Sequence, residues 1–327
     1  MTCRVALGLI VLGGLLCAAP SAAGAETWPG TKPLRFQTTS AAGGVTDIVP
    51  RLLSNHLAAL LGVPVIVENR PGAGGNIAAA IVARAEPDGH MLLSTGSNQA
   101  VNPTLLPNPG FDYQRDLVPV SMVVSAKFLL VASPAFPAEN LTDVIRLGKQ
   151  RAKSVSMAIS PIGTPNHLSA EMLAQYGGVD LLFVPYDGMT QALPDLVAGR
   201  VDLAAASLPI LLPMVHSGAL KPLAMLAPQR SLLAPDIPTA AEAGLPTLLL
   251  DGWLCFMTTG GTPAPIVARL DEAIGKTLQL PDVRYSLAKQ GVEVFHLHPA
   301  QLNEFLQAEA KRFGSLLEHS HVRRTAP

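Results

Sequence analysis

Short β-like segments alternate with helical segments along this chain, and Gly, Pro and Asn turns separate them. The first unit has an expected strand at 34–40, a helix at 46–61 ended by Gly62, and a second strand at 63–68. Further strands are expected in the same style at 91–95, 155–160, 179–184, 201–206 and 220–226. Alternation of this kind is typical of βαβ units. The sequence therefore predicts an α/β fold with mainly parallel sheets.

The N-terminal 25 residues have the pattern of an export signal. Arg4 supplies the positive charge, 5–19 the apolar stretch, and Ala23-Gly24-Ala25 a cleavage site of small residues. The apolar stretch of about 15 residues is short of the roughly 20 that a membrane-spanning helix needs. We therefore expect cleavage near Ala25 and export to the periplasm, with an uncleaved membrane anchor as the alternative.

Removal of this segment leaves about 300 residues, too many for a single hydrophobic core. Two lobes are therefore expected, and because no low-complexity linker separates them, they should share crossing strands. Cys255 is the only cysteine of the mature chain, which excludes an intramolecular disulfide. The formal net charge of the whole chain is -1, aromatic residues make up 5%, and no basic stripe is present. We expect a soluble monomer with no nucleic-acid partner.

Two glycine-containing segments resemble nucleotide-binding motifs but depart from them. Gly275-Lys276-Thr277 lacks the earlier glycine of a phosphate-binding loop, because Leu270 stands in its place. The segment 71–76 follows a strand and opens a helix, yet Ile77 occupies the place of the third glycine of a dinucleotide site. Both are interpreted as structural, so no cofactor is expected.

Four histidines are candidate metal ligands. His296 and His298 alternate on a strand-like stretch, and His319 and His321 lie near the C-terminus. None has the i, i+4 helical spacing with a carboxylate that zinc sites often show. The sequence therefore predicts no metal site and no catalytic residues.

Two loops with similar composition lie at corresponding places in the two halves of the chain. One is Ser40-Ala41-Ala42-Gly43-Gly44-Val45-Thr46-Asp47, and the other is Ser160-Pro161-Ile162-Gly163-Thr164-Pro165-Asn166-His167. Each joins a strand end to a helix N-terminus, whose unpaired N–H groups and partial positive charge suit an anion. Neither loop carries Lys or Arg, which favours a carboxylate over a highly charged phosphate. The alternative is that Thr46, Asp47 and Thr164 only cap their helices.

Asp47 would repel an anionic ligand. We expect its carboxylate to be buried and satisfied by backbone N–H groups rather than to contact a ligand carboxylate. The alternative is that it accepts a hydrogen bond from an amine or hydroxyl of the ligand.

A series of short motifs runs in order along nearly the whole mature chain: 43–47, 67–75, 87–89, 102–103, 163–168, 184–186, 199–202, 237–239, 242–244 and 261–263. In these motifs the chain resembles the Bug family of extracytoplasmic solute receptors, which are associated with tripartite tricarboxylate transporters.

The resemblance implies a two-lobe, Venus-flytrap periplasmic binding fold of the type II kind, with a hinge of crossing strands. One lobe would contain 26–128 and 250–327, and the other 129–249. The two loops would grip one carboxylate of a small organic acid, and lobe closure would bury it. The implied ligand-binding residues are Gly43, Gly44, Thr46 and Asp47, then Gly163, Thr164, Asn166 and His167, with Asn98 and Ser207 as weaker candidates.

The implied function is capture of a dicarboxylate, tricarboxylate or related acid for delivery to the membrane subunits of a tripartite tricarboxylate-type transporter. This sequence departs from the family pattern at several positions, which leaves the ligand open: Ala41, Ala42, Pro50, Asp187 and Ala205-Ala206. One alternative is a sensor that presents the ligand to a membrane signalling protein. Another is a hydrolase that uses His167.

Overall fold

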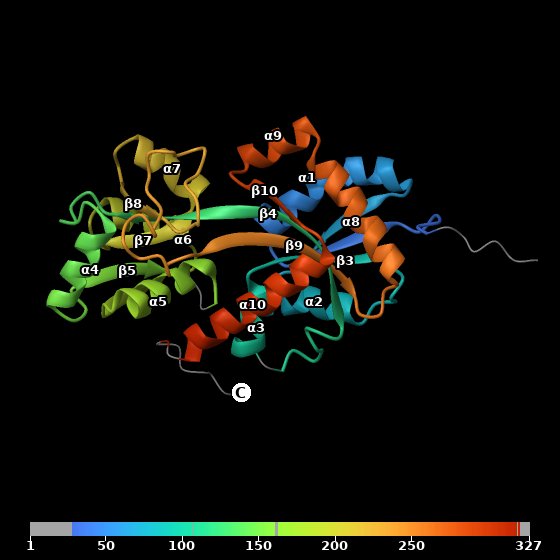
Figure 1. The fold of residues 1–327 in the computed structure, drawn as a ribbon, viewed down its shortest axis with the longest axis horizontal. Coiled ribbons are helices and arrows are strands. Elements are labelled where there is room, and N and C mark those ends of the chain that lie inside the picture. The colour runs from blue at the N-terminus through green and yellow to red at the C-terminus, as the bar shows by residue number, and fades with distance from the viewer. Residues whose placement is uncertain (1–27, 107, 161–162, 319, 321–327) are drawn as a thin grey trace, which may run out of the picture.

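The computed structural model describes residues 28–106, 108–160, 163–318 and 320. The proposed signal segment and its cleavage site near Ala25 lie outside this part of the chain, as do Pro161, Ile162, His319 and His321. Figure 1 shows two lobes side by side, joined by long strands and a C-terminal helix. Among the described residues, no helix combines the length and apolarity needed to cross a membrane.

The first lobe is built on a sheet with the strand order β2-β1-β3-β9-β4, to which β10 adds at β4. Strands β1, β2 and β3 are parallel, and β9 runs antiparallel between β3 and β4. The elements of this lobe before β4 are β1 (Leu34–Thr38), α1 (Val45–Leu61), β2 (Val65–Asn69), a 3₁₀ turn η1 (Ala73–Gly75), α2 (Asn76–Ala83), β3 (Met91–Gly96) and α3 (Asn98–Leu105). Those that return to it are β9 (Asp251–Thr259), α8 (Ala264–Leu278), α9 (Pro281–Lys289), β10 (Glu293–Leu297) and α10 (Pro299–Glu318).

The second lobe has the strand order β4-β7-β5-β6, with β8 also paired to β4. Strand β5 is parallel to β6 and β7. Its elements are α4 (Leu141–Gln150), β5 (Val155–Ile159), α5 (Pro165–Gly177), β6 (Leu181–Pro185), α6 (Met189–Val197), β7 (Leu203–Ser207), α7 (Leu208–His216) and β8 (Lys221–Met225).

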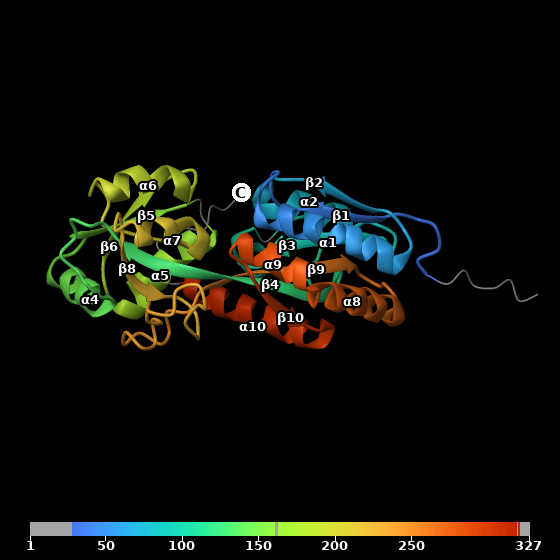
Figure 2. The same cartoon turned by 90° about the horizontal axis from the view of Figure 1, so that it is seen from above.

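The strand β4 (Leu117–Ala132) belongs to both sheets. It pairs with β9 as far as Lys127 and with β7 from Phe128 onward, and Figure 2 shows it running from one lobe into the other. Its pairings with β7, β8, β9 and β10 are all antiparallel. The predicted α/β fold with two lobes and crossing strands is confirmed. The sheets are mixed rather than mainly parallel, because the crossing strands pair antiparallel with their neighbours.

Local sequence explains most element boundaries. Helix α1 ends at Gly62, whose φ of 75° is a left-handed conformation that glycine adopts without a Cβ clash. In the first lobe, Leu53 and Leu57 of α1 belong to the same buried cluster as Phe36 of β1. The rings of Phe36 and Phe256 meet edge to face, with their centroids 4.7 Å apart. Apolar residues on both faces of β4 are buried, as expected for a strand covered on two sides.

Polar residues at two places in the first lobe are used inside the fold. Helix α8 begins at Ala264 with Pro263 at the cap position. Thr262 donates its hydroxyl to the Thr259 carbonyl oxygen at 2.7 Å and closes the preceding turn. On α10, Glu309 is buried, and Arg312 donates to the Leu249 carbonyl at 2.6 Å, where the chain returns from the second lobe.

Charged groups gather where the chain crosses between the lobes. Lys127 forms an ion pair with Glu293 at 3.0 Å and is opposite Asp251 in the β4–β9 ladder. One carboxylate oxygen of Asp251 is buried and has no hydrogen-bond partner among the described residues. Burial, and to a lesser extent Glu293 and Glu309, raise the pKa of Asp251 to about 7, although Lys127 and Arg312 act to lower it. Burial therefore favours the protonated form of Asp251 over the charged form.

We predict that Asp251→Asn removes a pH-dependent part of the stability. Because the pKa of Asp251 is raised in the folded state, its protonation stabilises the fold at low pH, and this stabilisation is lost as the pH rises through about 7. Between pH 5 and pH 8, the wild type should lose about 2 to 3 kcal/mol more unfolding free energy than the variant. Urea unfolding at the two pH values measures this, and parallel pH profiles for the two proteins would contradict it.

Candidate ligand-binding site

The two candidate loops lie at corresponding edges of the two sheets. The loop at 40–44 follows β1 and leads into α1; of the second loop, the described residues Ser160, Gly163 and Thr164 lie between β5 and α5. In each case the loop stands at the carboxyl end of a parallel strand and the N-terminal end of a helix, which is where open α/β sheets bind ligands.

Asp47 organises the first loop from within α1. Its carboxylate accepts hydrogen bonds from the Gly43 N–H at 2.9 Å, Asn69 at 2.8 Å and Arg51 at 2.7 Å. The Asp47 side chain is 4% exposed. Burial acts to raise the pKa of Asp47, but these three hydrogen bonds outweigh it and hold the pKa below its ordinary value. The carboxylate is thus ionised and compensated inside the protein, which agrees with the expected buried role.

Hydroxyl groups tie the rest of the first loop together. Thr46 donates its hydroxyl to Ser40 at 2.6 Å, and Ser94 on β3 donates to the Thr46 carbonyl at 2.7 Å. Gly44 is the N-cap of α1, and a Cβ there would lie 2.4 Å from the Ser40 hydroxyl oxygen. Gly43 has φ +88°, and a Cβ there would meet nothing within 4 Å. The loop is therefore packed at Gly44 and open beside Gly43.

In the second loop Thr164 is the N-cap of α5, and its side chain accepts from the His167 N–H at 3.4 Å. His167 is 1% exposed, and its Nδ1 accepts from the Gly163 N–H at 3.5 Å. Its Nε2 lies 3.5 Å from a carboxylate oxygen of Glu171, which is also buried. His167 thus holds the loop against the body of the lobe, as Asp47 does in the first loop.

The remaining predicted residues lie at neighbouring strand ends. Asn166 donates to the Ala205 carbonyl on β7 at 2.6 Å, which joins the α5 N-terminus to that strand. Ser207 is the last residue of β7 and the N-cap of α7. Asn98, the first residue of α3, donates to the Gly74 carbonyl at 2.9 Å.

Packing contacts bring the two loops toward one region between the lobes. In the second lobe, a Cβ on Gly163 would lie 2.8 Å from a methyl group of Leu105 and 3.6 Å from one of Val101, both on α3 of the first lobe. In the first lobe, α3 holds the turn η1, and a Cβ on Gly75 would lie 2.9 Å from the Thr39 methyl group next to the first loop. Helix α3 and η1 therefore connect the two loops across the lobe boundary.

Asn69 and Arg51 shape the first loop, although neither was expected in the site. Asn69, at the end of β2, donates to Asp47, to the Ser40 carbonyl and to the Thr38 hydroxyl. Arg51 donates to Asp47 and to Asn69. Asn69 lay inside a motif that supported the family resemblance, and Arg51 stands one helical turn after Asp47. The motif and the helical spacing drew attention to these two positions, but they did not indicate that both side chains bond to Asp47.

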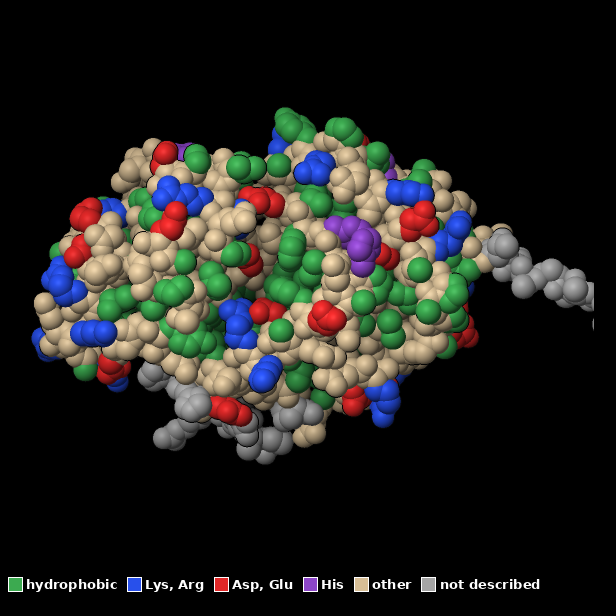
Figure 3. Space-filling view, in the orientation of Figure 1, with side chains coloured by type: hydrophobic (Ala, Val, Ile, Leu, Met, Phe, Trp, Pro, Cys, Tyr) green, Lys and Arg blue, Asp and Glu red, His purple; other side chains and the backbone are tan. Residues whose placement is uncertain are grey.

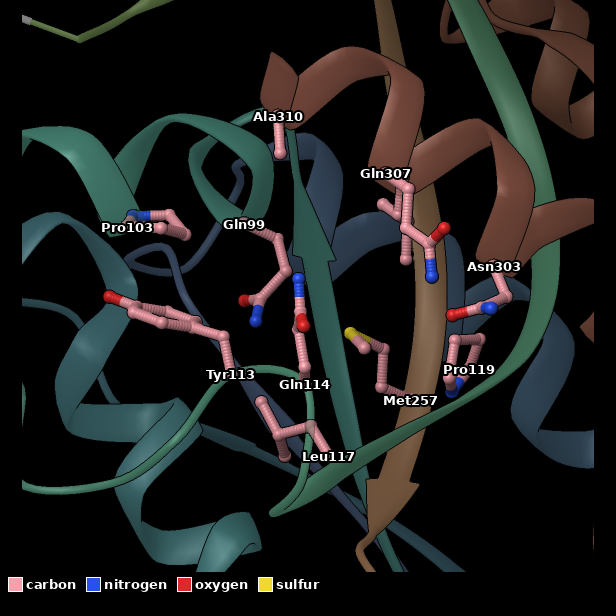
Figure 4. A pocket seen from close by; sticks show the side chains of 11 residues that line it. Gln99, Pro103, Tyr113, Gln114, Leu117, Pro119, Met257, Asn303, Gln307 and Ala310 are labelled. Atoms are coloured by element: carbon pink, nitrogen blue, oxygen red, sulfur yellow. The ribbon is translucent and has the colours of Figure 1, made fainter. Parts of the chain in front are cut away.

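A small pocket elsewhere on the first lobe does not have the size of a ligand site. Gln99 from α3 points into it beside Tyr113 and Met257, and Asn303 and Gln307 from α10 line its other side (Figure 4). Its volume of about 60 Å³ is well below the roughly 300 to 1,000 Å³ of typical small-molecule sites. The buried Gln99 side-chain nitrogen has no partner among the described residues, which suits a water-filled pocket.

The chain matches a family model and several known proteins over most of its length. Residues 49–322 match the tripartite tricarboxylate transporter family receptor, TctC. The chain is 33% identical to protein BugT of Bordetella pertussis over 316 residues, covering 95% of this chain and 97% of BugT.

Two solved structures show the same fold with a ligand. MatC from Rhodopseudomonas palustris with bound malate is 32% identical, with a TM-score of 0.73 over 87% of this chain and 99% of MatC. Rpa4515 from the same organism, with adipate, is 29% identical, with a TM-score of 0.75 over 89% of this chain and 97% of that one.

Receptors of this family bind substrates and are not enzymes, which excludes the hydrolase hypothesis built on His167. With 33% identity to BugT along nearly the whole chain and a family match over 49–322, this chain belongs to the tripartite tricarboxylate transporter receptor family and is a periplasmic solute-binding receptor of the Bug type.

Proposed function

We propose that this receptor captures a small dicarboxylate, tricarboxylate or related organic acid between its two lobes. The observation that carries the proposal is the pair of strand-to-helix loops at 40–47 and 160–167, each presenting a helix N-terminus at the lobe boundary. Helix N-termini offer N–H donors and a partial positive charge to an anion.

The charge balance of the first loop favours a carboxylate. Its nearest cation, Arg51, is already paired with Asp47 and so compensates that carboxylate rather than adding positive charge to the site. Neither loop contributes Lys or Arg of its own. Recognition would then rest on N–H groups and hydroxyls, which suit a singly charged carboxylate group better than a phosphate. The acids bound in the two similar structures, malate and adipate, are dicarboxylates.

The proposed ligand-binding residues are Gly43, Gly44, Thr46 and Asp47 in the first lobe and Gly163, Thr164, Asn166 and His167 in the second, with Asn98 and Ser207 beside them. Asp47 and His167 would act mainly by holding the loop backbones, because both are almost completely buried. Pre-organised loops lower the entropy cost of binding.

The lobe boundaries that we propose are 26–128 plus 250–327 for the first lobe and 129–249 for the second. The change of β4 partners between Lys127 and Phe128 supports the first crossing. The Leu250 N–H, which donates to the Leu226 carbonyl at 2.6 Å just before β9 begins, supports the second. Rotation about these two crossings would open and close the lobes on the ligand.

We further propose export with cleavage near Ala25, action as a monomer, and delivery of the acid to the membrane subunits of a tripartite tricarboxylate-type transporter. The family to which the chain belongs supports the delivery step.

Thr164→Ala tests the proposed site. A thermal-shift screen of mono-, di- and tricarboxylates first identifies an acid that binds. Isothermal titration calorimetry should then show affinity for that acid weakened by about 1 to 3 kcal/mol, because the bound carboxylate would lose the Thr164 hydroxyl as a hydrogen-bond partner between the closed lobes.

The matched control is Asn140→Ala. Asn140 caps α4 in the same lobe by accepting from the Asp143 N–H at 2.9 Å, so its loss removes a helix cap away from the loops. This variant should lose about 0.5 to 2 kcal/mol of unfolding free energy, as expected for the loss of a helix cap, and should keep wild-type affinity for the acid. Wild-type affinity in Thr164→Ala, or equal losses of affinity in both variants, would count against the site.

Trp253 provides a reporter for lobe closure. It lies on β9 opposite Ser125, its ring packs on Phe305 with centroids 5.6 Å apart, and its Nε1–H donates to Glu309 at 3.4 Å. In a Trp28→Phe variant, which leaves Trp253 as the single tryptophan, a binding acid should change the emission. Unchanged emission at a saturating concentration confirmed by calorimetry would argue against movement at this crossing.

A further inference from the structure

Three side chains outside the proposed ligand site converge on the surface of the first lobe. Asp271 lies on α8, and His296 and His298 lie at the end of β10 and just after it. His296 Nε2 is 2.9 Å from one carboxylate oxygen of Asp271, and His298 Nδ1 is 2.6 Å from the other. One ligand atom from each of the three lies within 4.8 Å of the others.

The surrounding structure holds this group in place. The Asp271 side chain is buried between α8 and β10, and both of its oxygens accept from the two histidines. Gly275 lies one helical turn after Asp271, and a Cβ there would be only 2.7 Å from the His296 ring. Glycine is less favourable than alanine inside a helix, because it loses more conformational freedom on folding. Gly275 is therefore the residue that lets the His296 imidazole approach the helix beside Asp271.

The group is also reachable from solvent. The His298 side chain is 65% exposed, and that of His296 is 17% exposed. Figure 3 shows a patch of histidine side chains on this face of the molecule, next to acidic groups. An ion could enter from the His298 side without any opening of the lobe.

We propose that Asp271, His296 and His298 form a binding site for a divalent transition-metal ion such as Zn²⁺. Two imidazole nitrogens and one carboxylate oxygen are donors that suit Zn²⁺, and a water molecule can complete its four-coordinate shell. The same donor set disfavours Ca²⁺ and Mg²⁺, which prefer oxygen ligands. Bound metal would join α8 to β10, which pairs with the crossing strand β4.

The spacing of His296 and His298 gave no indication of this site, because the third ligand stands 25 residues before His296 on a separate helix. The site does not depend on the proposed carboxylate function. Its test therefore stands whether or not the ligand loops are correctly assigned.

The experiment uses the mature chain without an affinity tag, freed of metal with a chelator and dialysed to equilibrium against Zn²⁺. We expect one zinc ion retained per chain and a melting temperature that rises with zinc concentration. His298→Gln should weaken zinc binding at least tenfold and abolish the thermal shift. Since His298 is exposed, this variant should fold normally, and circular dichroism checks this. Asp271→Asn should give the same loss.

The matched control is His56→Gln. His56 lies elsewhere on the same lobe, where its Nε2 is 3.1 Å from a carboxylate oxygen of Asp282. This variant should bind zinc as the wild type does. Absence of retained zinc in the wild type, or retention that survives His298→Gln, would overturn the proposal. An equal loss in His56→Gln would indicate adsorption to surface histidines and would overturn it as well.

Discussion

The backbone ladder along β4 is the interaction on which the rest of this structure depends. One strand of 16 residues is hydrogen-bonded to β9 in the first lobe and to β7 and β8 in the second. Because the neighbours of β4 are themselves bonded to the parallel strands of each lobe, this ladder determines where the carboxyl ends of those strands lie. The β1–α1 and β5–α5 loops consequently stand near the boundary between the lobes, and the contact of Gly163 with α3 joins the two sides.

In each loop, a buried side chain is paired with neighbouring groups that compensate its charge or polarity. Asp47 keeps its charge because Gly43, Asn69 and Arg51 donate to it, and His167 is engaged by Gly163 and Glu171. The loops therefore hold their backbone shape without placing an unpaired cation or anion beside the ligand. In the proposed site, recognition would therefore rest on N–H groups and hydroxyls, which suit an organic acid.

Much of the fold could be predicted from local patterns, while the contacts between distant segments could not. Helix α1 was expected at 46–61 and is observed at Val45–Leu61, because its apolar spacing and Gly62 are local signals. The mixed sheet was missed, since the direction of β4 and β9 relative to their neighbours depends on tertiary pairing. The partners of Asp47 illustrate the same limit: Asn69 is 22 residues away and meets it only because β2 lies beside β1. Thr262 shows that a residue suited to capping can instead close a turn when a carbonyl is nearer.

We propose that two loops from different lobes hold one carboxylate group of the ligand. A crystal structure of the protein with a dicarboxylate that binds in solution would test this proposal. We expect one ligand carboxylate within hydrogen-bonding distance of backbone N–H groups from both 43–46 and 163–167, with Asp47 still bonded to Arg51. A ligand held by one lobe alone, or bound away from both loops, would contradict it.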